Sequence, residues 1–188
     1  MMRLSDRVLP LTAKISLLVA LASLSAFLLA RTYLGDPETV YKEGTVTDTV
    51  SKGPVTLENA RWQLGSMQVF TQLVDEDQKK VALENNVPGS VVVAVHLAVT
   101  PLDGINRMSG GGFVCETQLR DDRGNIWKNQ DVDTPLGPSS CSDDDHPMKQ
   151  NQPNKLVKLY VVPASAVPHL VGIQVGSTEE FRRVLITF

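Results

Sequence analysis

Two cysteines, Cys115 and Cys141, have chemistry that depends on the compartment in which the chain lies. In an oxidising compartment they can form a disulfide, which we predict. The bond would close a loop of about 26 residues and stabilise the fold by roughly 3 to 4 kcal/mol through the lost entropy of the unfolded chain. Two separate thiols are the alternative. The pair lacks the CxxC spacing of redox-active or zinc-binding cysteines.

The stretch from residue 129 to 153 is rich in Asp and Pro, and a loop of this length in a compact domain is usually functional or held by a cross-link. Its possible cation ligands are Asp131, Asp133, Asp143, Asp144, Asp145 and His146. The order of residues that is typical of a calcium loop does not occur here. We therefore expect a solvated acidic loop, with a metal site or a docking surface for a basic partner as the functional alternatives.

His96 stands between Ala94 and Ala98 in an apolar run, where we expect a half-buried histidine with a hydrogen-bond partner. Nucleophile elbows, zinc-protease motifs and phosphate-binding glycine loops do not occur in the sequence. We therefore predict that the chain is not an enzyme, and no cofactor or small-molecule substrate is evident. A hydrolase built around His96 and a nearby Asp is the remaining catalytic alternative.

The longest uncharged stretch runs from Ile15 to Ala30, and its flanks extend the apolar length beyond about 20 residues, enough to cross a hydrocarbon core of about 30 Å. Excess Lys and Arg marks the cytoplasmic side of a span. The sequence therefore predicts a single-pass plasma-membrane protein with a cytoplasmic N-terminus and an extracytoplasmic domain. A cleaved secretory signal is the alternative. The charges that set this topology are Arg3, Arg7, Lys14 and Arg31.

The formal net charge of -3 is unevenly distributed. Residues 1–34 carry four basic residues against Asp6, a net of +3, so the remainder has a net charge of -6. An acidic domain outside the membrane argues against nucleic acid as a partner.

Small residues form a face on the predicted span. In lipid, such faces allow a second helix to approach closely, so we expect this face to dock against an integral membrane protein. Its members are Ser16, Ala20, Ala22, Ser23 and Ala26.

From Gly44 onward, short β-rich runs alternate with turn signals, and no amphipathic helix of a dozen residues is present. We divide the chain into a basic tail (1–14), a transmembrane helix (15–34), a flexible linker (35–43) and an extracytoplasmic domain (44–188). The domain is predicted to be all-β, an immunoglobulin-like antiparallel β-sandwich, with a closed barrel as the alternative. The expected strands are residues 45–50, 55–64, 69–74, 90–100, 113–120, 125–128, 155–162, 170–175 and 182–188.

Alternating apolar residues predict which face of each strand lies in the core. The odd positions of Ser90 to Thr100 are large aliphatics and are assigned to the core, as are Val184, Ile186 and Phe188. The alternation shifts near Asn59, which is typical of a β-bulge. For the strand at 155–162, the expected core residues are Val157, Leu159 and Val161.

Three segments carry a resemblance to a known family: QLRDDRGNIW (Gln118 to Trp127), KLYVVP (Lys158 to Pro163) and VLITF (Val184 to Phe188). Together they resemble the immunoglobulin-like domain of unknown function found in many Gram-positive, especially actinobacterial, secreted and membrane-anchored proteins. The resemblance spans about residues 44 to 188. It implies a β-sandwich on the outer face of the plasma membrane, and it carries over no catalytic residues.

The layout is also similar to that of single-span accessory subunits of actinobacterial membrane complexes, including the respiratory supercomplex that joins the cytochrome bc-type and oxidase complexes. We therefore expect a non-catalytic accessory subunit of a larger membrane complex. A free-standing binding module for a metal ion or a cell-envelope ligand is the alternative.

Overall fold

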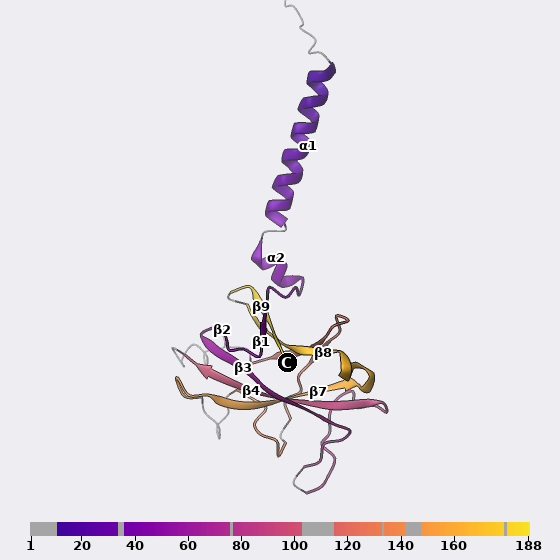
Figure 1. Ribbon diagram of the computed structural model, residues 1–188, viewed down its shortest axis with the longest axis vertical. Coiled ribbons are helices and arrows are strands. Elements are labelled where there is room, and N and C mark those ends of the chain that lie inside the picture. The colour runs from indigo at the N-terminus through magenta and orange to yellow at the C-terminus, as the bar shows by residue number, and fades with distance from the viewer. Residues whose placement is uncertain are drawn as a thin grey trace, which may run out of the picture.

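The computed structural model describes residues 11–33, 36–75, 77–102, 115–132, 134–141, 148–178 and 180–188. A long helix, α1 (Leu11–Tyr33), and a short helix, α2 (Pro37–Lys42), precede a domain of two packed β-sheets (Figure 1). Several candidate site residues lie outside the described residues, namely Arg3, Arg7, Asp133, Asp143, Asp144, Asp145 and His146.

Helix α1 is long and apolar enough to cross a membrane. Its candidate span, Ala13–Arg31, has 19 residues with a mean hydropathy of 2.1 and is not buried against the rest of the described chain. Lys14 and Arg31 lie at the two ends of this span, where long basic side chains can reach the membrane surfaces. A helix of this kind near the N-terminus is compatible with a single-pass anchor and with a signal sequence.

The segment predicted as a flexible linker contains helix α2, so that prediction is wrong in this respect. Asp36 is the N-cap: its side chain accepts hydrogen bonds from the Glu38 backbone at 3.4 Å and from the Thr39 hydroxyl at 2.8 Å. The Thr39 hydroxyl is the main cause that lowers the pKa of Asp36. Glu38 and Lys42 form an i,i+4 ion pair at 2.6 Å, which raises the pKa of Lys42. Short-range capping therefore favours a helix in this polar segment.

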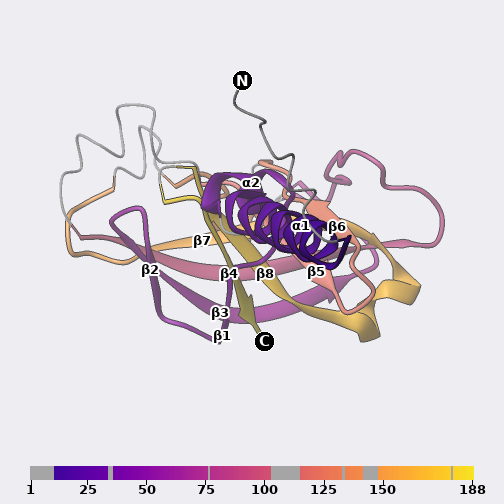
Figure 2. The ribbon, with the colours of Figure 1, turned by 90° about the horizontal axis from the view of Figure 1, so that it is seen from above.

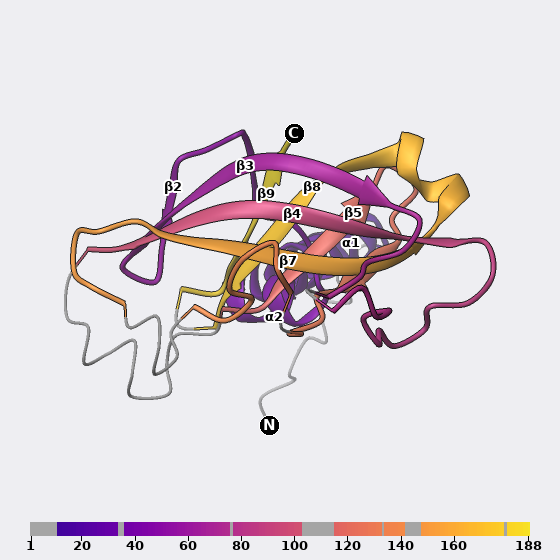
Figure 3. The same cartoon turned by 90° about the horizontal axis from the view of Figure 1, so that it is seen from below.

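Nine strands form the two sheets within the described residues, so the predicted β-sandwich is confirmed (Figures 1 and 3). The five-stranded sheet has the order β1 (Asp48–Ser51), β9 (Arg182–Thr187), β8 (Leu170–Ser177), β5 (Thr117–Asp121) and β6 (Ile126–Lys128). The four-stranded sheet has the order β2 (Val55–Leu57), β3 (Ala60–Phe70), β4 (Ser90–Pro101) and β7 (Asn154–Pro163). A 3-10 helix, η1 (Ala164–His169), connects β7 to β8.

The sandwich is antiparallel with one exception. Strand β1 pairs in parallel with β9, from Asp48 opposite Val184 to Ser51 opposite Thr187. The chain then crosses to the other sheet, where β2 begins, so β1 and β2 belong to different sheets. The order β9-β8-β5-β6 matches the G-F-C-C′ order of immunoglobulin domains, whereas β4 is an extra strand between β3 and β7.

The main core lies between the two sheets, and the predicted core face of β4 is confirmed. Val93, Val95 and Val99 are fully buried, and Leu97 is nearly so. They pack with residues of both sheets, including Trp62, Leu119, Tyr160, Ile173, Val184 and Ile186.

A second, smaller core lies on the outer face of the four-stranded sheet. Val92 and Ala94, on the even-numbered face of β4, are also fully buried, and they pack with Leu73, Val157 and Leu159. Side chains from the segments before and after β4 cover this cluster, namely Phe70, Val81, Leu83 and Leu136. Strands β4 and β7 are therefore buried on both faces over part of their length.

Two predicted features near β3 are wrong. Glu58 and Asn59 both have positive φ, 49° and 60°, and form the hairpin turn between β2 and β3, so the shift near Asn59 is a turn and not a bulge. The irregularity of β3 lies instead between Leu64 and Met67. No separate strand forms over residues 69–74, because β3 continues to Phe70 and the pairing with β4 ends there.

The predicted core face of β7 is also wrong. Val157 and Leu159 lie in the outer cluster and Val161 is half-buried, while the alternate residues face the space between the sheets. Since both faces of β7 are covered, alternation of apolar residues could not indicate its orientation. The residues that face inward are Leu156, Lys158, Tyr160 and Val162.

The turn between β5 and β6 is a hairpin, as predicted, and Asp121 organises it. The Asp121 carboxylate accepts hydrogen bonds from the backbone N–H of Arg123 at 3.0 Å and of Asn125 at 2.7 Å, and from the Asn125 side chain at 2.7 Å. Burial acts against the ionised form, but these hydrogen bonds outweigh it, and the pKa of Asp121 is lowered.

We therefore predict that Asp121 stabilises the fold above about pH 4, near the ordinary pKa of an unfolded Asp. This contribution is lost as the pH falls through the lowered pKa of the folded state. Asp121→Asn should melt at a lower temperature than the wild type at pH 7, with the difference shrinking below about pH 4. Thermal unfolding at several pH values measures this, with Asp77→Asn as an exposed control. An equal difference at pH 7 and pH 3 would contradict it.

Candidate functional site

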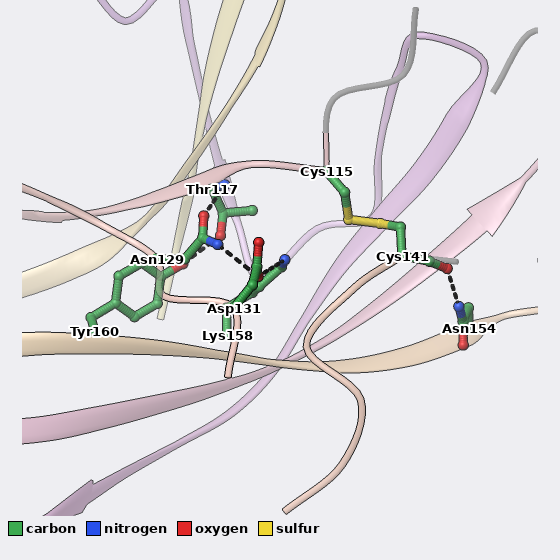
Figure 4. Close-up of a disulfide and its surroundings, with 8 residues drawn as sticks. All are labelled: Cys115, Thr117, Asn129, Asp131, Cys141, Asn154, Lys158 and Tyr160. Atoms are coloured by element: carbon green, nitrogen blue, oxygen red, sulfur yellow. Dashed lines mark hydrogen bonds and ion pairs between the residues drawn. A yellow bond between two sulfur atoms is a disulfide. The ribbon is translucent and has the colours of Figure 1, made fainter. Parts of the chain in front are cut away.

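The structure joins Cys115 and Cys141 in a disulfide, as predicted, with their Cα atoms 5.9 Å apart (Figure 4). Cys115 lies just before β5, and Cys141 is buried in the main core. The side chain of Asn154, at the start of β7, donates a hydrogen bond to the Cys141 carbonyl. The disulfide therefore attaches the end of the segment 134–141 to both sheets.

Beside the disulfide, five polar residues form an inner polar cluster: Thr117, Asn129, Asp131, Lys158 and Tyr160 (Figure 4). The Asn129 side chain accepts a hydrogen bond from the Thr117 backbone N–H at 2.9 Å and donates to Asp131 Oδ1 at 3.0 Å. Lys158 Nζ donates to the same Asp131 oxygen at 2.9 Å. The cluster connects β5, β7 and the segment that follows β6.

Lys158 is the buried charge of this cluster: its side chain is 1% exposed, whereas that of Asp131 is 55% exposed. A buried ammonium group needs an acceptor, and Asp131 supplies it. Asp131, predicted as part of a solvated acidic loop or a cation site, is half-exposed and is the ion-pair partner of Lys158. Across the described residues, no group of three or more His, Cys, Asp or Glu side chains is placed to bind a metal ion.

Tyr160 connects the two sheets through a hydrogen bond. Its side chain is fully buried, and its hydroxyl lies 2.5 Å from the Thr117 hydroxyl on β5. Burial is the main cause that raises the pKa of Tyr160, and the hydrogen bond with Thr117 opposes it. The phenol therefore stays neutral and serves as a hydrogen-bonding group across the core.

The inner polar cluster was not predicted, although the sequence contains one signal of it. Lys158 interrupts the apolar run KLVKLYVV, and a charge within such a run is either on the solvent face or buried with a partner. The prediction that Val157, Leu159 and Val161 face the core placed Lys158 on the opposite face, whereas its side chain is buried with a partner. Thr117, Asn129 and Tyr160 carried no signal, because their roles depend on contacts distant in sequence.

His96 lies in a hollow of about 330 Å³ on the outer face of the four-stranded sheet, which we call the outer-sheet hollow. Gly65 forms part of its wall, and a Cβ atom at this position would lie 2.9 Å from the His96 carbonyl oxygen. The titratable groups of the lining are His96 and Lys155. The hollow is lined by Gln63, Leu64, Gly65, His96, Leu97, Ala98, Leu136, Gly137, Pro138, Lys155, Leu156 and Val157.

Helix α2 is attached to the sandwich by contacts of Tyr41, which we call the α2 docking contact. The guanidinium carbon of Arg183 lies 4.2 Å from the centroid of the Tyr41 ring, and Arg183 Nε donates to the Tyr41 carbonyl at 3.0 Å. The Phe181 ring meets Tyr41 edge-on, with centroids 6.2 Å apart. Gly176 leaves room for the Tyr41 hydroxyl, because a Cβ there would lie 3.2 Å from it. A cation–π contact and a hydrogen bond thus connect α2 to β8 and β9.

The small residues of α1 are all exposed within this chain, and so are Lys14 and Arg31. Within the described residues, nothing buries the predicted span, so its docking role stays a prediction. The residues concerned are Ser16, Ala20, Ala22, Ser23 and Ala26.

Comparison with known proteins gives little beyond shape. No family model matches the chain, and no curated protein matches it. Among solved structures, the chain is similar to an uncharacterized β-sandwich protein from Clostridium difficile 630, with 8% sequence identity and a TM-score of 0.46. The match covers 76% of this chain and 95% of that one. Such a distant likeness carries no information about activity.

Proposed function

We propose that this protein is a non-catalytic accessory subunit of a larger plasma-membrane complex. In this proposal α1 anchors the chain in the bilayer with the N-terminus in the cytoplasm, and the β-sandwich lies on the outer face of the membrane. The partner is an integral membrane protein complex, with no nucleic acid and no cofactor involved.

The observation that carries the proposal is the α2 docking contact. A long flexible tether would let a free-standing module move over a large volume, whereas a helix docked on the domain shortens the tether and keeps the domain near the membrane. Restricting the domain to this smaller volume lowers the entropy cost of binding a partner embedded in the same membrane. At 1.5 Å per residue, the six residues of α2 span about 9 Å, so the domain would lie close to the bilayer.

The arrangement of the sheets supports a defined outward face. The five-stranded sheet lies on the side of α2, and the four-stranded sheet lies on the far side (Figure 1). Figure 2, which looks down on α1, shows the sandwich spread out beneath that helix. With α1 in a membrane, the four-stranded sheet and its outer-sheet hollow would face away from the bilayer.

The exposed side chains of α1 support docking within the membrane. Residues 14–31 are exposed within the described chain, so α1 is available to lipid or to other helices. The small residues at positions 16, 20 and 23, with 22 and 26, permit a close helix–helix approach. Arg3, Arg7 and Lys14 before the span support the proposed orientation, because basic residues favour the cytoplasmic side.

A narrower version of the proposal names the actinobacterial respiratory supercomplex as the assembly. It rests on a similarity of size and layout. The three segments that resemble the immunoglobulin-like family coincide with the β5–β6 hairpin, most of β7 and the end of β9. They therefore support the β-sandwich in this proposal, and they do not indicate which complex is the partner.

Cross-linking in intact membranes followed by mass spectrometry tests the proposal. We expect cross-links to another integral membrane protein, and co-purification with it after mild detergent extraction. The double variant Ala20→Leu/Ser23→Leu should reduce the yield of cross-links and the amount of co-purified partner several-fold, because bulky side chains keep the partner helix at a distance. Ser25→Leu, on the opposite face of α1, is the matched control and should behave as the wild type. A wild-type protein that elutes alone and monomeric in every mild detergent would contradict the proposal.

A second function, a binding module for a cell-envelope ligand, is favoured by the outer-sheet hollow. Its walls are mainly apolar, and it is lined by His96 and Lys155 but by no carboxylate. Ala98 on β4 pairs with Gln63 on β3 and with Lys155 on β7. Its small side chain leaves space between these two polar side chains. This combination suits an anionic ligand with an apolar group.

This second function predicts that 4-phenylbutyrate raises the melting temperature of the full chain in nanodiscs more than 4-phenylbutylamine does. Ala98→Leu should fill the hollow and abolish the effect, and Lys155→Met should remove the preference for the anion. Differential scanning fluorimetry with both compounds is the measurement. An equal response to both compounds, or a response that Ala98→Leu leaves unchanged, would retire the binding function.

A further inference from the structure

The inner polar cluster brings an amine and a primary carboxamide to one carboxylate. Lys158 Nζ and Asn129 Nδ2 both donate to Asp131 Oδ1, at 2.9 and 3.0 Å. In Figure 4, Asp131 lies between the other two side chains. Both nitrogens therefore lie within hydrogen-bonding distance of the same oxygen atom.

An amine and a carboxamide can exchange to form a new amide and ammonia, a reaction that is slow for exposed side chains in water. It requires a desolvated amine, a polarised carbonyl and a group that transfers protons. The Lys158 side chain is 1% exposed, so the first condition is met. The Thr117 backbone N–H donates to Asn129 Oδ1 at 2.9 Å, which meets the second, since it can stabilise negative charge on that oxygen. Asp131 contacts both nitrogens and meets the third.

We infer that Lys158 and Asn129 become joined by an isopeptide bond in a reaction that the protein carries out on itself. Asp131 accepts one proton from the Lys158 ammonium group, and the neutral amine moves from Asp131 to attack Asn129 Cγ. The resulting tetrahedral intermediate places its oxyanion against the Thr117 N–H. Asp131 then returns its proton to the departing nitrogen, and the Cγ–Nδ2 bond breaks to release ammonia. The ammonia takes up the remaining extra proton of the attacking nitrogen and leaves as ammonium. An ammonium and a carboxamide thus give a secondary amide and an ammonium ion, with no oxidant or reductant.

The surroundings suit such a reaction. The Asp131 side chain is 55% exposed, so ammonia and protons have a route to solvent while the amine of Lys158 stays buried. Backbone hydrogen bonds attach the segment that carries Asn129 and Asp131 to both sheets. The Asn129 N–H donates to the Thr117 carbonyl on β5 at 3.3 Å, and the Gln130 N–H donates to the Leu159 carbonyl on β7 at 2.8 Å. The segment that carries Asn129 and Asp131 is therefore held against both sheets, beside Lys158.

The inferred bond also explains why a lysine occupies the inner face of β7. An apolar residue of similar size at this position would be as stabilising as a buried ion pair, or more so. A covalent bond between Lys158 and Asn129 would connect β7, at the edge of the four-stranded sheet, to the segment that follows β6, at the edge of the other. Together with the disulfide, it would close this end of the sandwich with two covalent cross-links.

The intact mass of the purified full chain tests the inference directly. Beyond the loss of about 2 Da for the disulfide, we expect a further loss of about 17 Da, the mass of ammonia. Peptide mapping should recover one branched peptide in which Lys158 is joined to Asn129. Lys158→Met and Asp131→Ala should each show no loss of ammonia, and Asn129→Asp should lose water instead, about 18 Da. Lys155→Met, on the outer face of the same strand, is the matched control and should retain the loss of ammonia.

A wild-type mass that shows only the disulfide would overturn the inference. A loss of ammonia that maps to a single unbranched peptide would overturn it as well, because that result indicates cyclisation of an asparagine without Lys158. Since both results come from the wild-type chain, they do not depend on whether any variant folds.

Discussion

The contact between Arg183 and Tyr41 connects the two parts of this molecule. Tyr41 belongs to the short helix that follows the apolar helix, and Arg183 lies on β9 in the sandwich. A helix of six residues is not stable in water by itself, so α2 depends on its cap, its internal ion pair and this contact. If Arg183 did not bind Tyr41, residues 36–43 would revert to the flexible linker that their composition suggests.

The inner polar cluster shows a different physical compromise. Most of the space between the sheets is filled by aliphatic and aromatic side chains, as expected for a sandwich. Near the disulfide, however, Lys158 and Tyr160 lie on the inner face of β7, and each has a polar partner at hydrogen-bonding distance. Polar groups that are buried and paired in this way specify one arrangement of the sheets, at a cost in desolvation. The disulfide stabilises the same end of the domain.

The sequence predicted those features that depend on strong local signals. Three of these features can be recognised from neighbouring residues alone. They are the apolar stretch of α1, the five aliphatic residues at odd positions of β4 and the turn from Asp121 to Gly124. The disulfide followed from there being two cysteines in a segment assigned to the outside of the cell. The family resemblance implied a sandwich and named the segments that form β5, β6, β7 and β9.

Other features could not be predicted, because they depend on contacts between distant residues. The core face of β7 was assigned wrongly, because both of its faces are covered and Val157, Leu159 and Val161 form an alternating apolar set of their own. The turn at Asn59 looked like a bulge, because a two-residue hairpin also shifts the alternation by one. Helix α2 was assigned as a linker, since its contacts with Arg183 and Phe181 come from the far end of the chain.

Residues 37–42 thus belong to a helix that is docked on the sandwich, and they are not part of a flexible tether. Hydrogen–deuterium exchange of the full chain in nanodiscs tests this docking most directly, at the Val40 and Glu43 amides that bond within α2. The account predicts slow exchange in the wild type, at least about tenfold faster exchange in Arg183→Ala, and no change in Arg182→Ala, which contacts Asp48 and Glu180 instead. Exchange of these amides at the rate of an unstructured peptide in the wild type would contradict it.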